Sequence, residues 1–345
     1  MVTARRPLHP NVIVIILILG LVAFILYFYF YINPIQVVDI LSKTDLAYYS
    51  IAFITYSLYA FFSSLVWRNL LKNLSVTITA RKALLLTWVG LFFEATVPQL
   101  GWSGEVSKTY LLTKGSSHDA GKVGASVVGQ KIFTMTTTVV AMALGLALVL
   151  TSYPLPALVT FLISLVLALS ILTLLLIYYI SIKPSATKTL LNWGIRIILF
   201  FRKKWNPQNF NVRAEELLGR FHVGIKELRA NPKALVKPII YATLSFVCEV
   251  SVIFLTFVAL GYPVPVDKVL IVFTLTGTLQ TVGVTFFGFP ELIMSVTFSA
   301  LGIPAALSVS VTLLTRVVSL WFRLVVSYVA LQWTGIKIMR NHSHA

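Results

Sequence analysis

Ionisable side chains within long apolar stretches are the residues of this chain whose chemistry is most informative. A charged residue at membrane depth is costly, so it needs a partner of opposite charge or a functional role. Lysine and arginine side chains in these stretches could bind a lipid phosphate in a polar cavity, or they could form internal ion pairs with glutamates of the same stretches. The acidic and basic residues in these stretches are Glu94, Glu105, Lys108, Lys131, Glu249, Glu291, Arg316 and Arg323.

Two residues of each sign recur at a matched spacing. Glu105 and Glu291 are 186 positions apart, and Lys131 and Arg316 are 185 positions apart. Each glutamate ends a glycine-rich break after an apolar stretch, and each cation follows about 25 residues later. This pattern predicts an internal repeat in which Glu105 meets Lys131 and Glu291 meets Arg316 around one cavity. In transporters, the substrate often binds where two repeats meet.

The expected copies span residues 82–150 and 267–335, with breaks at 98–105 and 283–291. Irregular backbone at membrane depth is stable only where protein or a wet cavity satisfies its polar groups. We therefore predict that each break is a re-entrant hairpin or a broken helix. The residues that would end a helix or allow close backbone approach there are Pro98, Gly101, Gly104, Gly283, Gly288 and Pro290.

The elements that must position these residues are membrane helices. The chain is 58% hydrophobic and only 11% charged, which is far from the average of soluble domains. We expect an all-α polytopic membrane protein, a single integral membrane domain over 1–345, with about six full spans plus the two hairpins. The expected full spans are 12–32, 46–67, 123–150, 157–182, 238–260 and 306–334.

The basic loops predict an orientation. The net charge of +17 is spread over loops between spans, which fits the positive-inside pattern and does not indicate nucleic-acid binding. Residues 183–237 contain 12 Lys and Arg against 3 Glu, and they are expected to form an amphipathic cytoplasmic loop on anionic lipid headgroups. Both termini are then cytoplasmic, in the cell membrane, and the two repeats are inverted. Lys108, Lys114 and Lys122 are also expected on the cytoplasmic side.

Motifs of enzymes are missing from the sequence. It has no HExxH, no Walker loop, no DxD pair and no GxSxG. The single cysteine, Cys248, excludes a disulfide framework and a cysteine metal site. We expect a transporter rather than an enzyme, with no cofactor and no bound metal.

Three stretches of the chain carry recognisable motifs: P-x-x-G-x-x-G-E-x-x-K-x-Y-L-L from Pro98, VGASVVGQKI from Val123, and G-F-P-E-L-I, G-I-P-A-A and L-L-T-R up to Arg316. In these motifs the chain resembles the transmembrane region of the lysylphosphatidylglycerol synthase/flippase family. The resemblance implies a lipid-translocating domain with two re-entrant elements around a central cavity. It does not imply aminoacyl transfer, because a separate soluble domain follows this region in the bifunctional members and this chain ends at Ala345.

The leading hypothesis is therefore flippase-like transport of an anionic or glycosylated lipid between leaflets by alternating access. One alternative is a membrane-embedded lipid or polyprenyl-phosphate transferase that uses Glu105 or Glu291 as a general base. Another alternative is a non-catalytic membrane partner of a glycosyltransferase. The protein partners that the sequence leaves possible are a second copy of the chain and a lipid-modifying enzyme. Glu105 and Lys108, one helical turn apart, could also pair. The predicted substrate-binding residues are Glu105, Lys108, Lys131, Glu291, Arg316 and Arg323.

Overall fold

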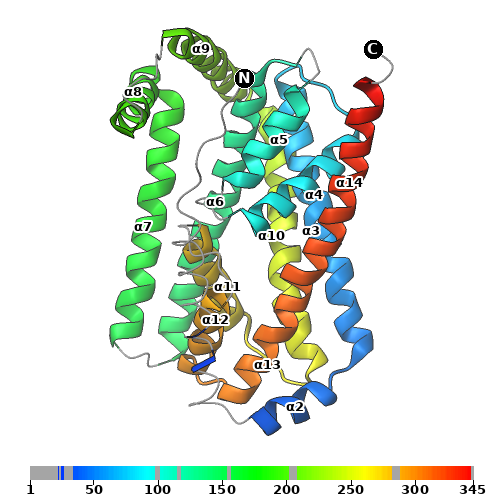
Figure 1. The fold of residues 1–345 in the computed structure, drawn as a ribbon. Helices are drawn as coiled ribbons and strands as arrows, with labels where there is room; N and C mark the ends of the chain where they lie inside the picture. The colour runs from blue at the N-terminus through cyan, green and yellow to red at the C-terminus, as the bar shows by residue number, and fades with distance from the viewer. Residues whose placement is uncertain are drawn as a thin grey trace.

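The computed structural model describes residues 22, 25–26, 34–97, 102–114, 118–153, 157–201, 208–281 and 288–342. Nearly all of these residues are helical and none of them lies in a β-strand, which confirms the all-α polytopic prediction (Figure 1). The helices in chain order are α2 (Pro34–Ser42), α3 (Leu46–Asn73), α4 (Ala80–Thr96), α5 (Ser103–Thr113), α6 (Ala120–Ser152), α7 (Ala157–Ile182), α8 (Pro184–Phe201), α9 (Gln208–Ala230), α10 (Pro232–Ala259), α11 (Val266–Thr281), α12 (Phe289–Ala300), α13 (Ala305–Arg316), the π-helix η1 (Val317–Phe322) and α14 (Arg323–His342).

Five helical segments within the described residues are long and apolar enough to cross a bilayer. At about 1.5 Å per residue, each of them is longer than the roughly 30 Å hydrocarbon core. Each overlaps one predicted span, whereas the predicted first span at 12–32 lies almost wholly outside the described residues. The five segments are Leu46–Asn73, Ala120–Ser152, Ala157–Ile182, Pro232–Ala259 and Ala305–Thr334.

Two pairs of shorter helices form hairpins that do not cross the bundle. The helices α4, α5, α11 and α12 have 17, 11, 16 and 12 residues, so none of them matches the length of a full span. In Figure 1, α4 and α5 occupy the upper half of the bundle and α11 and α12 occupy the lower half. The chain therefore enters the two hairpins from opposite ends, as an inverted arrangement requires.

Small residues bring the arms of the first hairpin together. A Cβ placed on Gly104 of α5 would lie 2.6 Å from the carbonyl oxygen of Gly90 on α4, and such a distance is not tolerated. Glycine at both positions removes the side chains that would otherwise separate the two backbones. Pro98 and Gly101, predicted for this break, and Gly283, predicted for the second break, lie outside the described residues.

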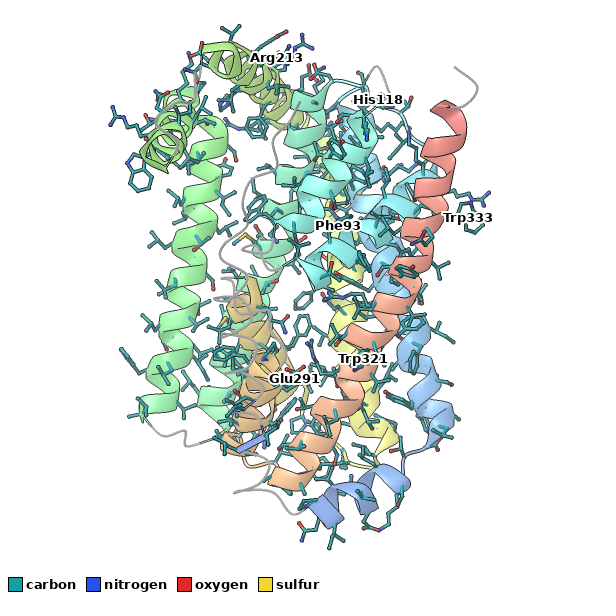
Figure 2. All side chains as sticks on the ribbon, in the orientation of Figure 1. Phe93, His118, Arg213, Glu291, Trp321 and Trp333 are labelled. Atoms are coloured by element: carbon teal, nitrogen blue, oxygen red, sulfur yellow. The ribbon has the colours of Figure 1, made fainter. Side chains whose placement is uncertain are left out.

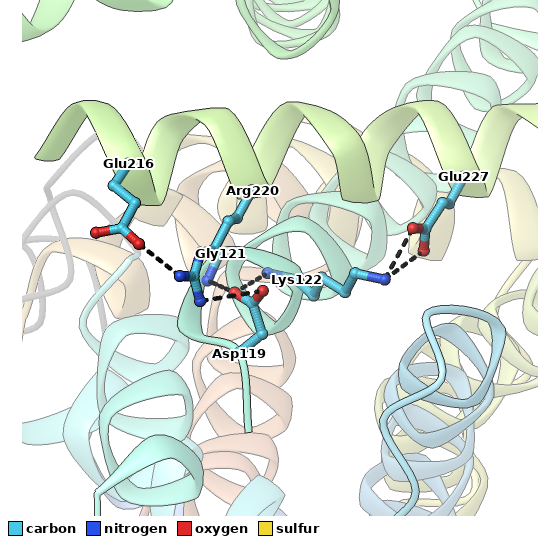
Figure 3. A network of polar contacts seen from close by, with 6 residues as sticks. All are labelled: Asp119, Gly121, Lys122, Glu216, Arg220 and Glu227. Atoms are coloured by element: carbon cyan, nitrogen blue, oxygen red, sulfur yellow. Dashed lines mark hydrogen bonds and ion pairs between the residues drawn. The ribbon is translucent and has the colours of Figure 1, made fainter. Parts of the chain in front are cut away.

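Most of the basic segment 183–237 lies in two helices at one end of the bundle, α8 and α9, and its last residues begin α10 (Figure 1). Ion pairs join α9 to the start of α6 (Figure 3), with Lys122 Nζ 2.8 Å from Glu227 Oε1. Arg220 contacts Glu216 of its own helix at 2.5 Å and Asp119 at 3.7 Å. Asp119, which contacts Arg220, also caps the start of α6, because its carboxylate accepts hydrogen bonds from the first backbone N–H groups of that helix.

Candidate functional site

The first predicted ion pair joins the first hairpin to the long helix that follows it. Lys131 Nζ of α6 lies 3.8 Å from Glu105 Oε1 of α5, and the two side chains are 11% and 18% exposed. The ammonium also lies over the ring of Trp102, 5.4 Å from its centroid. Glu105 is in the first turn of α5, where the free N–H groups of a helix start favour a negative charge. A separation of 3.8 Å exceeds a hydrogen bond, so charge attraction holds this pair.

The second predicted pair is tighter and has backbone support. Arg316 Nε of α13 donates to Glu291 Oε1 of α12 at 2.5 Å, and the two side chains are 13% and 4% exposed. The other carboxylate oxygen of Glu291 accepts the backbone N–H of Gly288 at 2.8 Å. Gly288 has a φ of 96°, which side chains rarely adopt, and Pro290 lies in the first turn, where a missing N–H costs least. Figure 2 shows Glu291 inside the bundle, between α12 and the α13–α14 segment.

The possible pairing of Lys108 with Glu105 is not found in the structure. Lys108 lies in α5 and is only 6% exposed. Its ammonium donates to Gln130 Oε1 at 3.2 Å and lies 5.3 Å from the ring centroid of Trp67, whereas the ion pair of Glu105 is with Lys131. Their spacing along the helix brings Glu105 and Lys108 to one side of α5. Each nevertheless has its partner on α6, Lys131 for Glu105 and Gln130 for Lys108.

A cavity of about 340 Å³ is lined by residues of both predicted repeats, 82–150 and 267–335. Its wall includes Lys131 from α6, Arg316 from α13 and Arg323 from α14, so three of the predicted cations face one space. Apolar side chains of α7, α10 and α11 form much of the remaining wall, among them Val166 and Phe273. The arrangement combines charged groups that can bind an anion with a surface that can contact a hydrocarbon chain.

Arg323 is brought to this cavity by a local change of helix type. The π-helix η1 lies between Arg316 and Arg323, and such wider turns occur frequently at functional sites. Arg323 Nε is buried with no hydrogen-bond partner within the described residues. A buried donor in this state favours binding of an acceptor such as a phosphate oxygen.

A second, smaller cavity of about 100 Å³ adjoins the first on the side of the first hairpin. Glu105 and Lys108 line it, together with polar residues of α3, α4 and α10. The residues that line both cavities are Tyr59, Glu94, Lys131, Thr134 and Glu249. The two spaces therefore share a wall and can accept two parts of one ligand.

Glu94 and Glu249 belong to this site, although neither is among the predicted binding residues. Both line the two cavities, and within the described residues neither has a cation within 4 Å. Their only signal in the sequence is an acid in an apolar stretch, FFEAT for Glu94 and VCEVS for Glu249. Tyr56 and Tyr59 gave no signal at all, because tyrosine is common in membrane helices.

Comparison of the sequence with known proteins identifies the family of this chain. Residues 12–327 match the family described as the lysylphosphatidylglycerol synthase TM region. The chain belongs to this family.

Relatives named UPF0104 membrane proteins align along most of their length. One from Pyrococcus horikoshii is 24% identical over 316 residues, which is 89% of this chain and 90% of the relative. One from Methanocaldococcus jannaschii is 26% identical over 315 residues, 89% of this chain and 91% of the relative. One from Methanothermobacter thermautotrophicus is 23% identical over 341 residues, 96% and 97% of the two chains.

The match to the lysylphosphatidylglycerol synthase TM region contains the whole candidate site. Both hairpins and every charged residue of the two cavities, from Glu94 to Arg323, lie within residues 12–327. The shared region is thus the membrane bundle itself, with the cavity at its centre.

Proposed function

We propose that this member of the lysylphosphatidylglycerol synthase TM family translocates an anionic or glycosylated lipid between the two leaflets of the cell membrane. The observation that carries the proposal is the convergence of Lys131, Arg316 and Arg323 on one partly apolar cavity between two oppositely directed hairpins. A lipid with a phosphate headgroup has the two chemical parts that this wall can bind. The two hairpin units, 82–150 and 267–335, act as inverted repeats.

Exchange of ionic partners is the proposed binding step. In the structure, Lys131 faces Glu105 and Arg316 faces Glu291. An entering phosphate competes with the two carboxylates, and Arg323 supplies a donor that is not already used by a carboxylate within the described residues. Arg binds two phosphate oxygens at once and Lys acts as a point charge, so the three cations together can hold the headgroup.

The hydrocarbon chain of the lipid would leave the cavity beside α7. This helix contributes Val166, Leu169 and Thr173 to the cavity wall, while most of its other residues are exposed on the surface of the bundle. An apolar path to the lipid phase lets the acyl or isoprenoid chain remain in hydrocarbon while the headgroup moves. Rocking of the inverted halves would then open the cavity to either leaflet in turn.

The end of the bundle that carries α8 and α9 is the proposed cytoplasmic side. The basic segment 183–237 lies there, and basic loops are retained on the cytoplasmic face. Both termini are proposed to be cytoplasmic for the same reason. Exposed Trp193 and the cations of α8 are suited to contact with anionic lipid headgroups.

Reconstitution into vesicles tests the function. A fluorescent phosphatidylglycerol and a fluorescent isoprenoid phosphate are placed in both leaflets, and a membrane-impermeant quencher then reports how fast label from the inner leaflet becomes accessible. Wild-type protein should accelerate movement of at least one of these lipids over protein-free vesicles. Lys131→Gln and Arg323→Gln should slow it by about tenfold or more, because each removes a charge-assisted contact worth roughly 1.5–3 kcal/mol.

The matched control is Lys43→Gln, which removes a lysine that pairs with Asp39 on the exposed surface of α2, away from both cavities. Its rate should equal that of the wild type. Wild-type vesicles that translocate neither lipid, or equal rates in the wild type and both cavity variants, would overturn the proposal.

A further inference from the structure

The small cavity beside the first hairpin contains buried polar atoms that its own side chains do not satisfy within the described residues. Glu105 Oε2 and Thr87 Oγ1 are buried with no hydrogen-bond partner in the part of the chain that the structure describes, and Thr87 is only 3% exposed. Glu94 and Glu249 have no cation within 4 Å there. Unsatisfied buried polar groups are unfavourable, so a ligand that supplies donors is expected in this space.

The cations of the small cavity are already engaged. Lys108 donates to Gln130, and Lys131 lies beside Glu105 and over the ring of Trp102. Gln130 in turn donates to Ser63 at 3.1 Å. The titratable and charged groups that face the two cavities from all sides are Tyr56, Tyr59, Glu94, Glu105, Lys108, Lys131, Glu249, Arg316 and Arg323.

The large cavity adds two cations that do not line the small one. Arg316 and Arg323 line the large cavity, and Nε of Arg323 is a donor without a partner within the described residues. Because Glu94, Glu249 and Lys131 line both spaces, one ligand can contact the acids of the small cavity and the arginines of the large one. Such a ligand presents hydrogen-bond donors to the small cavity and an anion to the large one.

We propose that the small cavity is the binding subsite for a sugar headgroup, and that the lipid is a glycosyl phosphate. The hydroxyl groups of the sugar donate to Glu94, Glu249 and Glu105, while the phosphate is bound by Arg316 and Arg323. This inference rests on the proposed lipid transport, because it names the headgroup of the transported lipid.

Charge excludes a second phosphate from this space, because it would face the acidic side chains of Glu94, Glu105 and Glu249. Sugar hydroxyls avoid this repulsion and can donate to Glu105 Oε2, which has no hydrogen-bond partner within the described residues. A volume of about 100 Å³ exceeds the space of a single water several-fold, so it can receive a group with several hydroxyls.

The test compares two lipids that differ only in the sugar, an isoprenoid hexosyl phosphate and the same isoprenoid phosphate without it. Binding to the purified full chain is measured by native mass spectrometry with both lipids present, and translocation is measured in vesicles. Wild-type protein should prefer the hexosyl phosphate by about tenfold or more, which corresponds to at least one charge-assisted hydrogen bond. In Glu94→Gln, Glu249→Gln and Thr87→Val, the ratio of the two affinities should fall toward one.

The matched control is Glu227→Gln, which neutralises a glutamate of α9 outside both cavities and should keep the wild-type ratio. Equal binding of the two lipids by the wild type would overturn the sugar subsite and leave lipid transport standing. Variants that keep the wild-type preference would overturn it as well. Failure of the wild type to bind or move either isoprenoid lipid would also overturn the sugar subsite, and it would overturn the proposed function only if phosphatidylglycerol is not translocated either.

Discussion

The two hairpins carry the same residue types at matched positions but hold them differently. In the first, Lys131 and Glu105 are 3.8 Å apart and one oxygen of the carboxylate is unsatisfied within the described residues. In the second, Arg316 donates to Glu291 at 2.5 Å and Gly288 donates to the other oxygen. The difference teaches that one glutamate is a fixed part of its hairpin, whereas the other remains available to a ligand.

Backbone packing differs in the same sense. The first hairpin depends on contact of α4 with α5 through Gly90 and Gly104, where a Cβ has no room. In the second hairpin, a Cβ on Gly277 of α11 would have nothing within 4 Å. The first hairpin is therefore closed by direct backbone contact, and the second has open space beside α11 that belongs to the large cavity.

The largest effect should come from breaking the tight pair. Glu291→Gln leaves the buried Arg316 without its counter-charge and the Gly288 N–H with a weaker acceptor, so the free energy of unfolding should fall by about 3–5 kcal/mol. Glu105→Gln should cost about 1 kcal/mol, because its pair is longer and faces a cavity. Thermal unfolding of the detergent-extracted proteins measures both.

The double variant Glu291→Gln with Arg316→Gln should recover part of this loss, since it removes the uncompensated charge. Equal destabilisation by Glu291→Gln and Glu105→Gln would remove the distinction between a fixed pair and an available one.

A smaller effect is expected from adding one methyl group to each hairpin. Gly104→Ala forces α4 and α5 apart, because its Cβ would lie 2.6 Å from a backbone oxygen, and overpacking of this kind costs about 1–3 kcal/mol. Gly277→Ala should be neutral or stabilise α11 by up to about 1 kcal/mol, since alanine favours helix and space is available. Melting temperatures of the two variants under one condition provide the measurement, and similar shifts would contradict the packing difference.

The ion pair of Lys122 with Glu227 should matter less. This pair is partly exposed, so Lys122→Gln should lower the free energy of unfolding by about 1 kcal/mol or less, and the loss should shrink as salt is added. The control is Lys43→Gln, which removes a more exposed pair of similar length on α2. A loss after Lys122→Gln that exceeds the loss after Gly104→Ala would show that α9, rather than glycine packing, supports the first half of the bundle.

The smallest effect concerns His222 on α9, whose ring lies 3.0 Å from the Thr187 hydroxyl of α8. Burial lowers the pKa of His222 below its ordinary value of about 6.5, against a smaller raising effect of a hydrogen bond to the Ser181 backbone. The unfolded chain then binds more protons just below pH 6.5, so stability should decrease slightly as the pH falls through that window. His222→Gln should abolish this slope in unfolding experiments between pH 7.5 and about 5.5, and an unchanged slope would assign it to another group.

Much of the frame was predictable because it depends on composition and spacing along the chain. Runs of about 20 apolar residues give spans, and glycine and proline next to a glutamate give the helix starts at α5 and α12. The contacts of Lys131 with Glu105 and of Arg316 with Glu291 followed from matched intervals. The π-helix before Arg323 did not follow, because no residue pattern in Val317–Phe322 distinguishes it from an ordinary helix.

There is a physical reason why the surroundings of Lys108, Glu94 and Glu249 could not be predicted from the sequence. In a membrane helix the lipid-facing side and the protein-facing side are both apolar, so hydrophobic periodicity does not reveal how the helix is rotated. Lys108 was expected to be able to pair with Glu105 and instead lies buried against Gln130 and Trp67. Glu94 and Glu249, far apart in sequence, line one wall only because α4 and α10 both pack around α3.

The sequence by itself determined that the chain is a helical membrane protein with two glycine-containing hairpins. It also determined that a glutamate follows each break and that a cation follows about 25 residues later. These properties depend on local composition, on helix length and on the cost of charge in hydrocarbon. Only the tertiary structure decided which charges share a cavity, which glutamate is fixed and which acceptors remain free. Those properties depend on the rotation and packing of helices that are distant in sequence, and local composition does not encode them.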